Sequence, residues 1–462
     1  MPSGWNALAY ARSQMGISLA FHIVFAAAGV ALPALMVIAD VAHRRTRDPQ
    51  YLLLSKQLAK GTSILFAVGA VSGTVLSFEL GLLWPGFMAR FGESIGLPFA
   101  LEGFAFFTEA IFLGIYLYGR DRVSPRLHLA SGIVVAVSGA ASAFFVTLVN
   151  AFMNGPGGSD PVAAMWSPSW PYQVVHVLLS CYQATAWAMV GIHGFVLLRD
   201  PARTLHRKAL TLALPIACAT ALVQPLSGDR SAKHVAVAQP LKLAAAEAHL
   251  HTQARAPLHV GGVPDLATGE FHGAIAIPGA LSFLAHGDFG ATVTGLDAFP
   301  RDEWPPVVSV RTAFQVMVGA GSTMALAALA IIAATLRRRR LPDGRRWLLA
   351  FVVLGPLGFV SLEAGWLVTE WGRQPWTVRG LLRTADAVTS FPYKAAPFWL
   401  FTVVYLFLGA AVAYLLAKQI NSVPSEGPEP PAMGSARQSR ATPDAIGHAD
   451  RPHAPSADGH GA

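Results

Sequence analysis

Residues 17–40 read ISLAFHIVFAAAGVALPALMVIAD, an apolar run in which His22 is the one ionisable side chain before Asp40 closes it. A helix of about 20 such residues spans a hydrocarbon core of about 30 Å, where helices satisfy their own backbone groups. Similar runs recur along the chain, which predicts an all-α, polytopic membrane protein with about nine transmembrane helices. The predicted spans are 17–40, 61–84, 98–118, 128–151, 174–198, 209–226, 310–335, 347–369 and 396–417.

The composition agrees with a membrane protein. Of 462 residues, 53% are hydrophobic and 13% are charged, whereas about 25% are charged in an ordinary soluble domain. Membrane topology accounts for the formal net charge of +8, so no nucleic-acid partner is expected. Cys181 and Cys218 lie inside apolar spans and are predicted to be core residues. The first residues lack a basic region and a small-residue cleavage site, so no signal peptide is predicted.

The distribution of basic residues predicts sidedness. The loops after the first, third, fifth and seventh spans are basic, as in RRRRLPDGRR at 337–346, and the positive-inside rule makes these loops cytoplasmic. The N-terminus then lies outside and the C-terminus inside. The predicted organisation is a six-helix part (1–226), an outer segment (227–309), a three-helix part (310–417) and a disordered cytoplasmic tail (418–462).

Ionisable side chains inside spans are candidates for function, because a charge there costs about 2.5–3.5 kcal/mol on insertion scales. Met317 joins them because a thioether can ligate heme iron. The candidates are His22, Glu79, Glu102, Glu109, His176, His193, Glu363, Glu370 and Met317. Five of these lie near the outer ends of five different spans and are expected at one membrane level. These five are His22, Glu102, His176, Met317 and Glu370.

Four of the candidates suit heme iron. His176 and Met317 could reach one iron from opposite faces and make it six-coordinate and low-spin, whereas His22 and Glu370 would each suit a five-coordinate iron. Structural interpretations compete with these. A lone histidine or methionine is often a core residue, His22 could make a hydrogen bond within the helix bundle, and Glu370 could pair with Arg373.

Glu102 and Glu109 are seven residues apart, hence on nearly the same helix face and about 10.5 Å apart along the axis. This spacing favours a proton relay through the bundle, since a carboxyl out of water can hold and pass a proton. Structural hydrogen bonding is the alternative. Glu79 and His193 lie nearer span ends, and for them the structural interpretation is preferred.

These elements resemble, in order, those of subunit I of cytochrome bd-type quinol oxidases, over residues 8–417. The most specific likeness is GRQPW at 372–376, just after Glu370. The other similar stretches are ARSQMGISLAFH ending at His22, FALEGFAFFTEAIFLGIYLYG with Glu102 and Glu109, YQVVH ending at His176, FQVMVG with Met317, and GDRSAKHVAVAQPLKLAAAEAH with Lys242 and Glu247.

The resemblance implies the heme-bearing subunit of a respiratory terminal oxidase. His176 and Met317 would ligate a low-spin heme b. His22 and Glu370 would ligate a high-spin heme b and a heme d, in an order that the sequence leaves open, with a further heme b as the alternative to heme d. The other residues implied around the hemes are Trp366, Arg373, Gln374 and Trp376.

The resemblance also implies the reaction, in which membrane quinol is oxidised and oxygen is reduced to water. Segment 227–309 would be the periplasmic quinol-binding loop, with Lys242 holding a quinol oxygen and Glu247 accepting a proton, while Glu102 and Glu109 relay protons. Charge would be separated across a bacterial cytoplasmic (inner) membrane without a pumping step. The implied partners are subunit II, a small single-helix accessory subunit as a further candidate, ubiquinol or menaquinol, and oxygen.

The chain departs from the family pattern at two places, and two other functions compete with the oxidase interpretation. Many family members carry an arginine two residues before the heme methionine, where this chain has Gln315, a feature that resembles the cyanide-insensitive branch. The outer segment resembles the shorter version of the loop.

A proton-coupled membrane transporter would also bury carboxylates and histidines, but the chain lacks signs of inverted repeats. A diheme electron-transfer subunit would need histidine pairs that the chain lacks.

Overall fold

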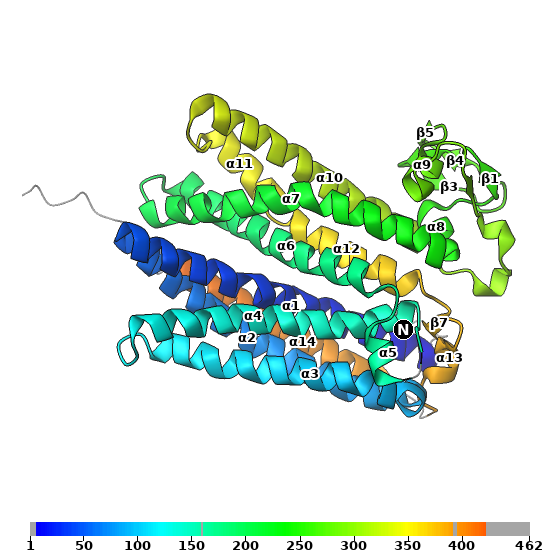
Figure 1. Ribbon diagram of the computed structural model, residues 1–462, viewed down its shortest axis with the longest axis horizontal. Helices are drawn as coiled ribbons and strands as arrows, with labels where there is room; N and C mark the ends of the chain where they lie inside the picture. Colours follow the sequence, from blue (N-terminus) through cyan, green and yellow to red (C-terminus); the bar gives the residue numbers. More distant parts are fainter. Residues whose placement is uncertain (1–5, 159, 391–394, 422–462) are drawn as a thin grey trace, which may run out of the picture. The chain divides into compact units, whose positions relative to one another are not determined.

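The computed structural model describes residues 6–158, 160–390 and 395–421, which belong to one compact unit. Within these ranges, nine helical segments are long and apolar enough to cross a membrane, which confirms the predicted fold class. Figure 1 shows them running side by side. They are α1 (Ala7–Thr46), α2 (Pro49–Leu83), α3 (Pro85–Tyr118), α4 (Pro125–Asn154), α6 (Trp170–Arg199), α7 (Thr204–Ala238), α10 (Val307–Arg338), the pair α11 (Arg345–Leu354) and α12 (Leu357–Trp371), and α14 (Ala395–Asn421).

Several helices begin where a capping side chain precedes a proline. Asp48 accepts a hydrogen bond from the backbone of Gln50 at the start of α2, and Ser124 accepts one from Leu127 at the start of α4. Proline follows each cap at the first helical position, where its missing N–H costs nothing and its fixed φ suits the helix. The sequence therefore sets these helix starts locally.

The helices extend beyond the predicted spans. α3 begins at Pro85, ahead of the predicted start at 98, and continues through Pro98, while α7 runs past the predicted end at 226 to Ala238. A hydropathy window detects only the apolar middle of a helix, so polar turns such as the one holding Arg90 and Glu93 were missed. Helix ends cannot be located from hydropathy alone.

The last two spans also differ from their predicted form. The predicted span 347–369 consists of two helices, α11 and α12, which are separated at Gly355 and Pro356. Proline lacks the N–H that an unbroken helix would use. α14 continues to Asn421, so the tail predicted from residue 418 begins inside a helix, and residues 422–462 lie outside the described residues.

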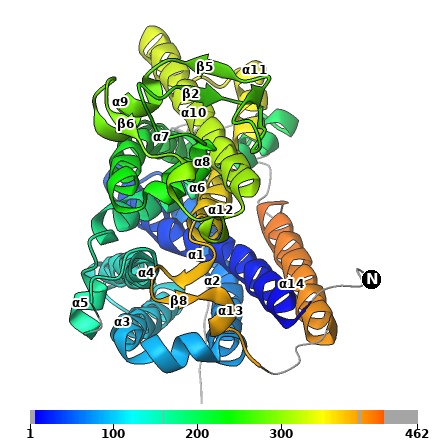
Figure 2. The same ribbon diagram turned by 90° about the vertical axis from the view of Figure 1, so that its right-hand side faces the viewer.

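Short elements gather at one end of the bundle (Figures 1 and 2). Three antiparallel strand pairs are nested in the outer segment, β1 with β6, β2 with β5 and β3 with β4, and a fourth pair, β7 with β8, follows α12. The strands are β1 (Gln253–Ala254), β2 (Leu258–Val260), β3 (Val263–Pro264), β4 (Phe271–His272), β5 (Ile275–Ile277), β6 (Thr292–Val293), β7 (Trp376–Val378) and β8 (Leu382–Arg383). The short helices are α5 (Pro161–Met165), α8 (Pro240–Glu247), α9 (Ala280–His286), α13 (Thr384–Ala387), η1 (Leu296–Ala298) and η2 (Arg301–Glu303).

Small residues let α6 approach the α11–α12 pair closely. A Cβ added to Gly191 would lie 2.7 Å from the Cα of Gly355, and one added to Gly358 would lie 2.5 Å from the Cα of Ala184. No side chain fits between backbones at these distances. Close backbone approach through glycine and alanine is typical of helix packing in membranes, where the hydrophobic effect contributes little between helices.

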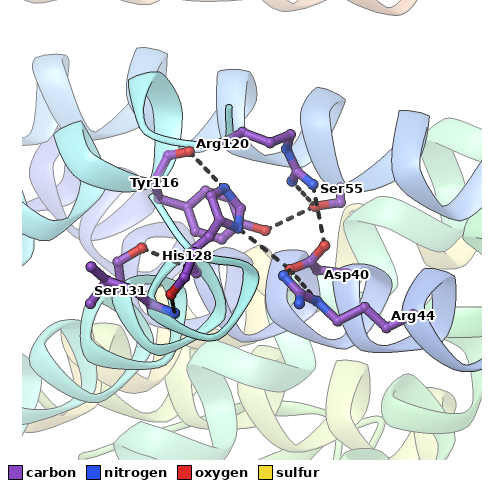
Figure 3. A network of polar contacts seen from close by, with 9 residues as sticks. Asp40, Arg44, Ser55, Tyr116, Arg120, His128 and Ser131 are labelled. Carbon is purple, nitrogen blue, oxygen red and sulfur yellow. Dashed lines mark hydrogen bonds and ion pairs between the residues drawn. The ribbon is translucent and has the colours of Figure 1, made fainter. Parts of the chain in front are cut away.

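A buried polar network links the four helices α1, α2, α3 and α4 (Figure 3). It lies at the end of the bundle where the basic loops are. The Asp40 side chain is 1% exposed, and its carboxylate lies 3.4 Å from Nη1 of Arg120 and 3.6 Å from Nδ1 of His128. The hydroxyl groups of Ser55 and Tyr116 are 2.9 Å apart beside it. A buried carboxylate is stable only with such partners, so the network fixes these four helix ends together.

Candidate functional site

One large cavity brings most of the predicted site residues together. Its volume is about 1340 Å³, which exceeds the range of about 300–1000 Å³ usual for one small-molecule ligand. Helices from both halves of the chain line it. The predicted residues in its wall are His22, Glu102, Glu109, His176, Lys242, Met317, Trp366, Glu370, Arg373 and Gln374. Five predicted candidates do not line it, namely Glu79, His193, Glu247, Glu363 and Trp376.

The two candidate histidine ligands are held by hydroxyl groups. Nδ1 of His22 on α1 lies 3.0 Å from Oγ of Ser72 on α2, and Nδ1 of His176 on α6 lies 2.8 Å from Oγ of Ser227 on α7. Gln224 also contacts His176, with its Nε2 3.2 Å from the histidine Nε2. A hydrogen bond to one imidazole nitrogen commonly orients a metal-ligating histidine. The same contacts also satisfy the helix-bundle interpretation of His22.

Met317 lies on α10 against α12, where a glycine makes room for its thioether. A Cβ added to Gly365 would lie 3.0 Å from the Met317 sulfur. The backbone carbonyl of Met317 accepts a hydrogen bond from Ser361 of α12 at 3.1 Å. The thioether is therefore placed by close packing of the two helices, and it faces the cavity.

Glu370 is held on both carboxylate oxygens. Nδ2 of Asn150 donates to Oε1 at 2.8 Å, and Nη2 of Arg373 donates to Oε2 at 2.5 Å. The ion pair with Arg373, weighed as the structural alternative for Glu370, is therefore present. Gln374 contacts the Glu370 backbone carbonyl at 3.4 Å and accepts a hydrogen bond from Thr384 at 2.9 Å. The carboxylate is thus held between α4 and the segment that follows α12.

Unpaired donors in the cavity wall indicate the chemistry that the cavity accepts. Arg373 is 5% exposed, and its Nε and Nη1 are buried without a hydrogen-bond partner. Buried guanidinium donors normally find acceptors, and carboxylates match their geometry. Across residues 6–158, 160–390 and 395–421, no cluster of three or more His, Cys, Asp or Glu could hold a bare metal ion. Single ligands around a large cavity fit an iron whose other ligands belong to a porphyrin with carboxylate side chains.

The paired glutamates of α3 lie along one wall of the cavity, toward α4. Oγ of Ser142 donates to Glu102 at 3.0 Å. Glu109 is 5% exposed, and its Oε1 has no hydrogen-bond partner. Gly139 of α4 makes room for it, because a Cβ added there would lie 3.4 Å from both carboxylate oxygens. The same-face arrangement predicted for the two carboxyls therefore holds, and the deeper one lacks a fixed partner.

Lys242 of α8 lines this cavity although it is only 7% exposed. Its Nζ donates to Oδ1 of Asn154 and lies 3.4 Å from the carbonyl of Thr369. Burial lowers the pKa of Lys242 to about 7, with the charge of Arg373 acting in the same direction and that of Glu370 opposing it. Lys242 can therefore exchange protons near neutral pH.

Glu247 ends α8 and does not line the cavity, although its neighbour Ala246 does. Burial raises its pKa to about 7, against the opposing effect of Arg311, whose Nη1 lies 3.7 Å from the carboxylate. Arg311 also donates to the carbonyls of Glu247 at 2.8 Å, His259 at 2.9 Å and Gly261 at 2.9 Å. Gln315, one turn further along α10, accepts a hydrogen bond from the Gly261 backbone at 3.1 Å. Arg311 and Gln315 therefore anchor the outer segment.

Of the remaining predicted residues, Glu79, His193 and Trp376 have structural partners, whereas Oε1 of Glu363 is buried without a hydrogen-bond partner. Glu79 accepts hydrogen bonds from Gln14 at 2.7 Å and Ser18 at 2.8 Å, and His193 lies 2.8 Å from His206 between their Nδ1 atoms. Both contacts support the structural interpretation preferred for these two residues. Trp376 packs under the guanidinium of Arg383, 5.1 Å from its ring centroid. Cys181 and Cys218 are buried and free, as predicted.

Sequence reasoning missed Asn150, Asn154 and Arg311. Arg311 gave a signal in the sequence, because it is a charged residue near the start of the predicted span 310–335. Asn150 and Asn154 gave a weaker signal in the sequence, because they are two amide side chains one helical turn apart at the end of an apolar span. An uncharged amide carries no large membrane penalty, so its position alone did not mark it as functional.

These features together define a multi-pass membrane subunit built to enclose prosthetic groups between its helices. Residues 10–424 match the family model described as cytochrome bd terminal oxidase subunit I. The chain belongs to this family, and it is an oxidoreductase of the respiratory chain.

Relatives and a solved structure agree with the family match. The chain is 39% identical, over 88% of its length and 95% of the relative, to a Bacillus subtilis protein named as a candidate cytochrome bd menaquinol oxidase subunit I. It is 30% identical, over 90% of its length and 93% of the relative, to a cytochrome bd ubiquinol oxidase subunit 1 of the same organism. The structure of bd oxidase from Geobacillus thermodenitrificans superposes with a TM-score of 0.85 at 38% identity, covering 91% of this chain and all of that one.

These matches give no support to the transporter alternative. Heme as the class of cofactor follows from the family. The likeness to the cyanide-insensitive branch stays a prediction.

Proposed function

We propose that this chain oxidises a membrane quinol and provides the ligands of the hemes at which oxygen is reduced to water. The observation that carries this proposal is that one cavity holds His22, His176, Met317, Glu370 and Lys242. The printed names of the relatives, which include menaquinol and ubiquinol oxidases, support a quinol as the electron donor.

His176 and Met317 would hold a low-spin heme b, and His22 and Glu370 would hold a high-spin heme b and a heme d, with a further heme b as the alternative to heme d. When bound, these hemes supply electron transfer and the reduction of oxygen. The protein orients the histidines through Ser72 and Ser227. The unpaired donors of Arg373 suit propionate carboxylates.

Quinol would bind at the outer end of the cavity, within the segment predicted as 227–309. Lys242 would donate a hydrogen bond to a quinol oxygen, and Glu247 would accept a proton. A carboxyl with a pKa of about 7 accepts and releases protons at neutral pH, which suits it to this role. Arg311 would hold Glu247 in position.

Protons for oxygen reduction would come through the bundle. Glu102 and Glu109 would form a relay along α3, with Ser142 holding the first carboxyl and Gly139 leaving the second one free to turn. Quinol protons would leave on the outer side, while the relay draws protons from the cytoplasm. Turnover would then separate charge without a pumping step.

The proposed setting is a bacterial cytoplasmic (inner) membrane, with the N-terminus in the periplasm and the C-terminus in the cytoplasm. Basic loops on one side of the bundle support this orientation. Family membership implies a subunit II partner, and a small single-helix accessory subunit is a further proposed partner.

Purification with subunit II tests the function directly. The complex is expected to be coloured, to yield b-type and d-type hemes on extraction, and to consume oxygen when quinol is added. Ubiquinol and menaquinol analogues tested in parallel would identify the donor. A colourless complex would contradict the heme assignment, and a coloured complex that consumes no oxygen with any quinol would contradict the oxidase assignment.

A further inference from the structure

A continuous chain of hydrogen bonds joins Lys242 to Glu370 through two amides of α4. Nζ of Lys242 donates to Oδ1 of Asn154, whose Nδ2 donates to Oδ1 of Asn150 at 3.0 Å. Nδ2 of Asn150 then donates to Oε1 of Glu370 at 2.8 Å. The chain begins in the buried interior, since Lys242 is 7% exposed and Asn154 is 0% exposed, and it ends at Glu370, whose side chain is 21% exposed.

All the hydrogen bonds of this chain point the same way. Each amide accepts with its oxygen from the Lys242 side and donates with its nitrogen toward Glu370. Hydrogen bonds aligned between a cation and an anion polarise one another, and the effect is greater where the surroundings are apolar. Replacement of the Lys242 contact at one end therefore changes the strength of the hydrogen bond on the Glu370 carboxylate at the other end.

A second contact keeps the chain in place. Nδ2 of Asn154 also lies 2.9 Å from the backbone carbonyl of Asn150, one helical turn earlier. That carbonyl is fixed by α4, so the Asn154 amide is held in the orientation that presents its oxygen to Lys242. The Asn154 amide is thus positioned by the helix backbone as well as by the groups that it connects.

We propose that Asn154 and Asn150 are positioning residues that couple occupation of the quinol site to the orientation of the Glu370 carboxylate. This inference rests on the proposed function, in which Lys242 contacts quinol and Glu370 is an iron ligand. A quinol oxygen that takes hydrogen bonds from Lys242 competes with Asn154. The Asn150 hydrogen bond then weakens, and Glu370 is freed on the side that Arg373 does not hold.

Coupling of this kind is reciprocal, since the effect of one site on the other is a shared free energy. It predicts that a ligand in the quinol site changes the absorption spectrum of the heme at Glu370 although the two do not touch. A merely structural role for Asn154 would alter heme content or stability but would leave this response intact in the protein that retains its hemes.

The test uses the purified holoenzyme with subunit II and a 4-hydroxyquinoline N-oxide as the probe of the quinol site. Its dissociation constant and the change that it causes in the heme absorption bands are measured together. Asn154→Leu removes the link between Lys242 and Asn150. Asn154→Asp keeps an acceptor for Lys242 but cannot donate to Asn150, and it is the second variant in case the first loses its hemes.

Thr377→Val is the matched control. Thr377 lines the same cavity and is buried, but its hydroxyl contacts Thr384 at 3.3 Å and not the amide chain. The wild type and Thr377→Val are expected to show the spectral change on binding of the probe. Both Asn154 variants should bind the probe yet lose the spectral change.

Different outcomes overturn different statements. If the Asn154 variants respond as the wild type does, or if the wild type binds the probe with no spectral change, the coupling is wrong while the proposed function stands. If the wild-type complex contains no heme or does not bind the probe, the proposed function fails and the coupling fails with it.

Discussion

Arg311 makes four polar contacts in the outer segment, three with backbone carbonyls and one with the Glu247 carboxylate. If Glu247 accepts the quinol proton, it must be ionised to act, so activity should fall as the pH drops through its pKa of about 7. Arg311 lowers that pKa. Arg311→Met should therefore move the acid limb of the kcat/KM profile for quinol to higher pH, by about 1 pH unit.

Two variants control for this change. Arg311→Lys keeps the positive charge and should leave the acid limb near its wild-type position. Arg301→Met removes a charge from the same outer segment, where Arg301 stacks on Trp304 at 4.1 Å, and it should not move the limb. An acid limb that stays in place in Arg311→Met would mean that Glu247 is not the group that titrates.

At the level of single residues, the sequence was most informative where burial is costly. Glu109 and Glu370 stood out because a carboxylate in an apolar span demands an explanation. Asn150 escaped notice because its importance comes from a partner that lies 220 positions away in the chain. Glu247 was identified by resemblance, but no pattern in the sequence could show that its carboxylate lies beside Arg311.

At the level of helices, hydropathy located each transmembrane span but did not show which other helices pack against it. Which helices touch depends on small residues whose positions look unremarkable in a single sequence, such as Gly191 of α6. The break between α11 and α12 at Gly355 was likewise absent from the predicted span, although Pro356 follows it. A glycine in a helix identifies a place where another helix could approach closely. Only the folded structure shows which helix does so.

Gly191→Ala tests the crossing of α6 and α11. The added methyl group would lie 2.7 Å from the Cα of Gly355, so the helices must separate, at a cost of about 1–3 kcal/mol. The midpoint of thermal unfolding of the purified complex should fall, and heme should be released at a lower temperature. Gly81→Ala is the control, because nothing lies within 4 Å of a Cβ at that position. Equal midpoints for the two variants would contradict the close crossing.

At the level of the whole molecule, the cavity connects the proposed quinol site at one end with carboxyls deeper in the bundle. Lys242 lies in the outer segment, while Glu109 lies on α3 further toward the basic loops. If these loops face the cytoplasm, protons released from quinol and protons consumed at oxygen belong to opposite sides of the membrane. The direction of proton movement then depends on how the whole chain is inserted.

Glu109→Gln tests this arrangement in proteoliposomes. Glutamine keeps the shape of the side chain but cannot carry a proton, so turnover with quinol should fall by about 100-fold or more. The KM for quinol should stay within about twofold, because quinol docking does not involve Glu109. Proton uptake from the cytoplasmic side should fall in parallel. Glu79→Gln alters another buried carboxyl, one held by Gln14 and Ser18, and should retain turnover. Full turnover in Glu109→Gln would exclude the relay along α3, and a raised KM with normal turnover would place Glu109 at the quinol site instead.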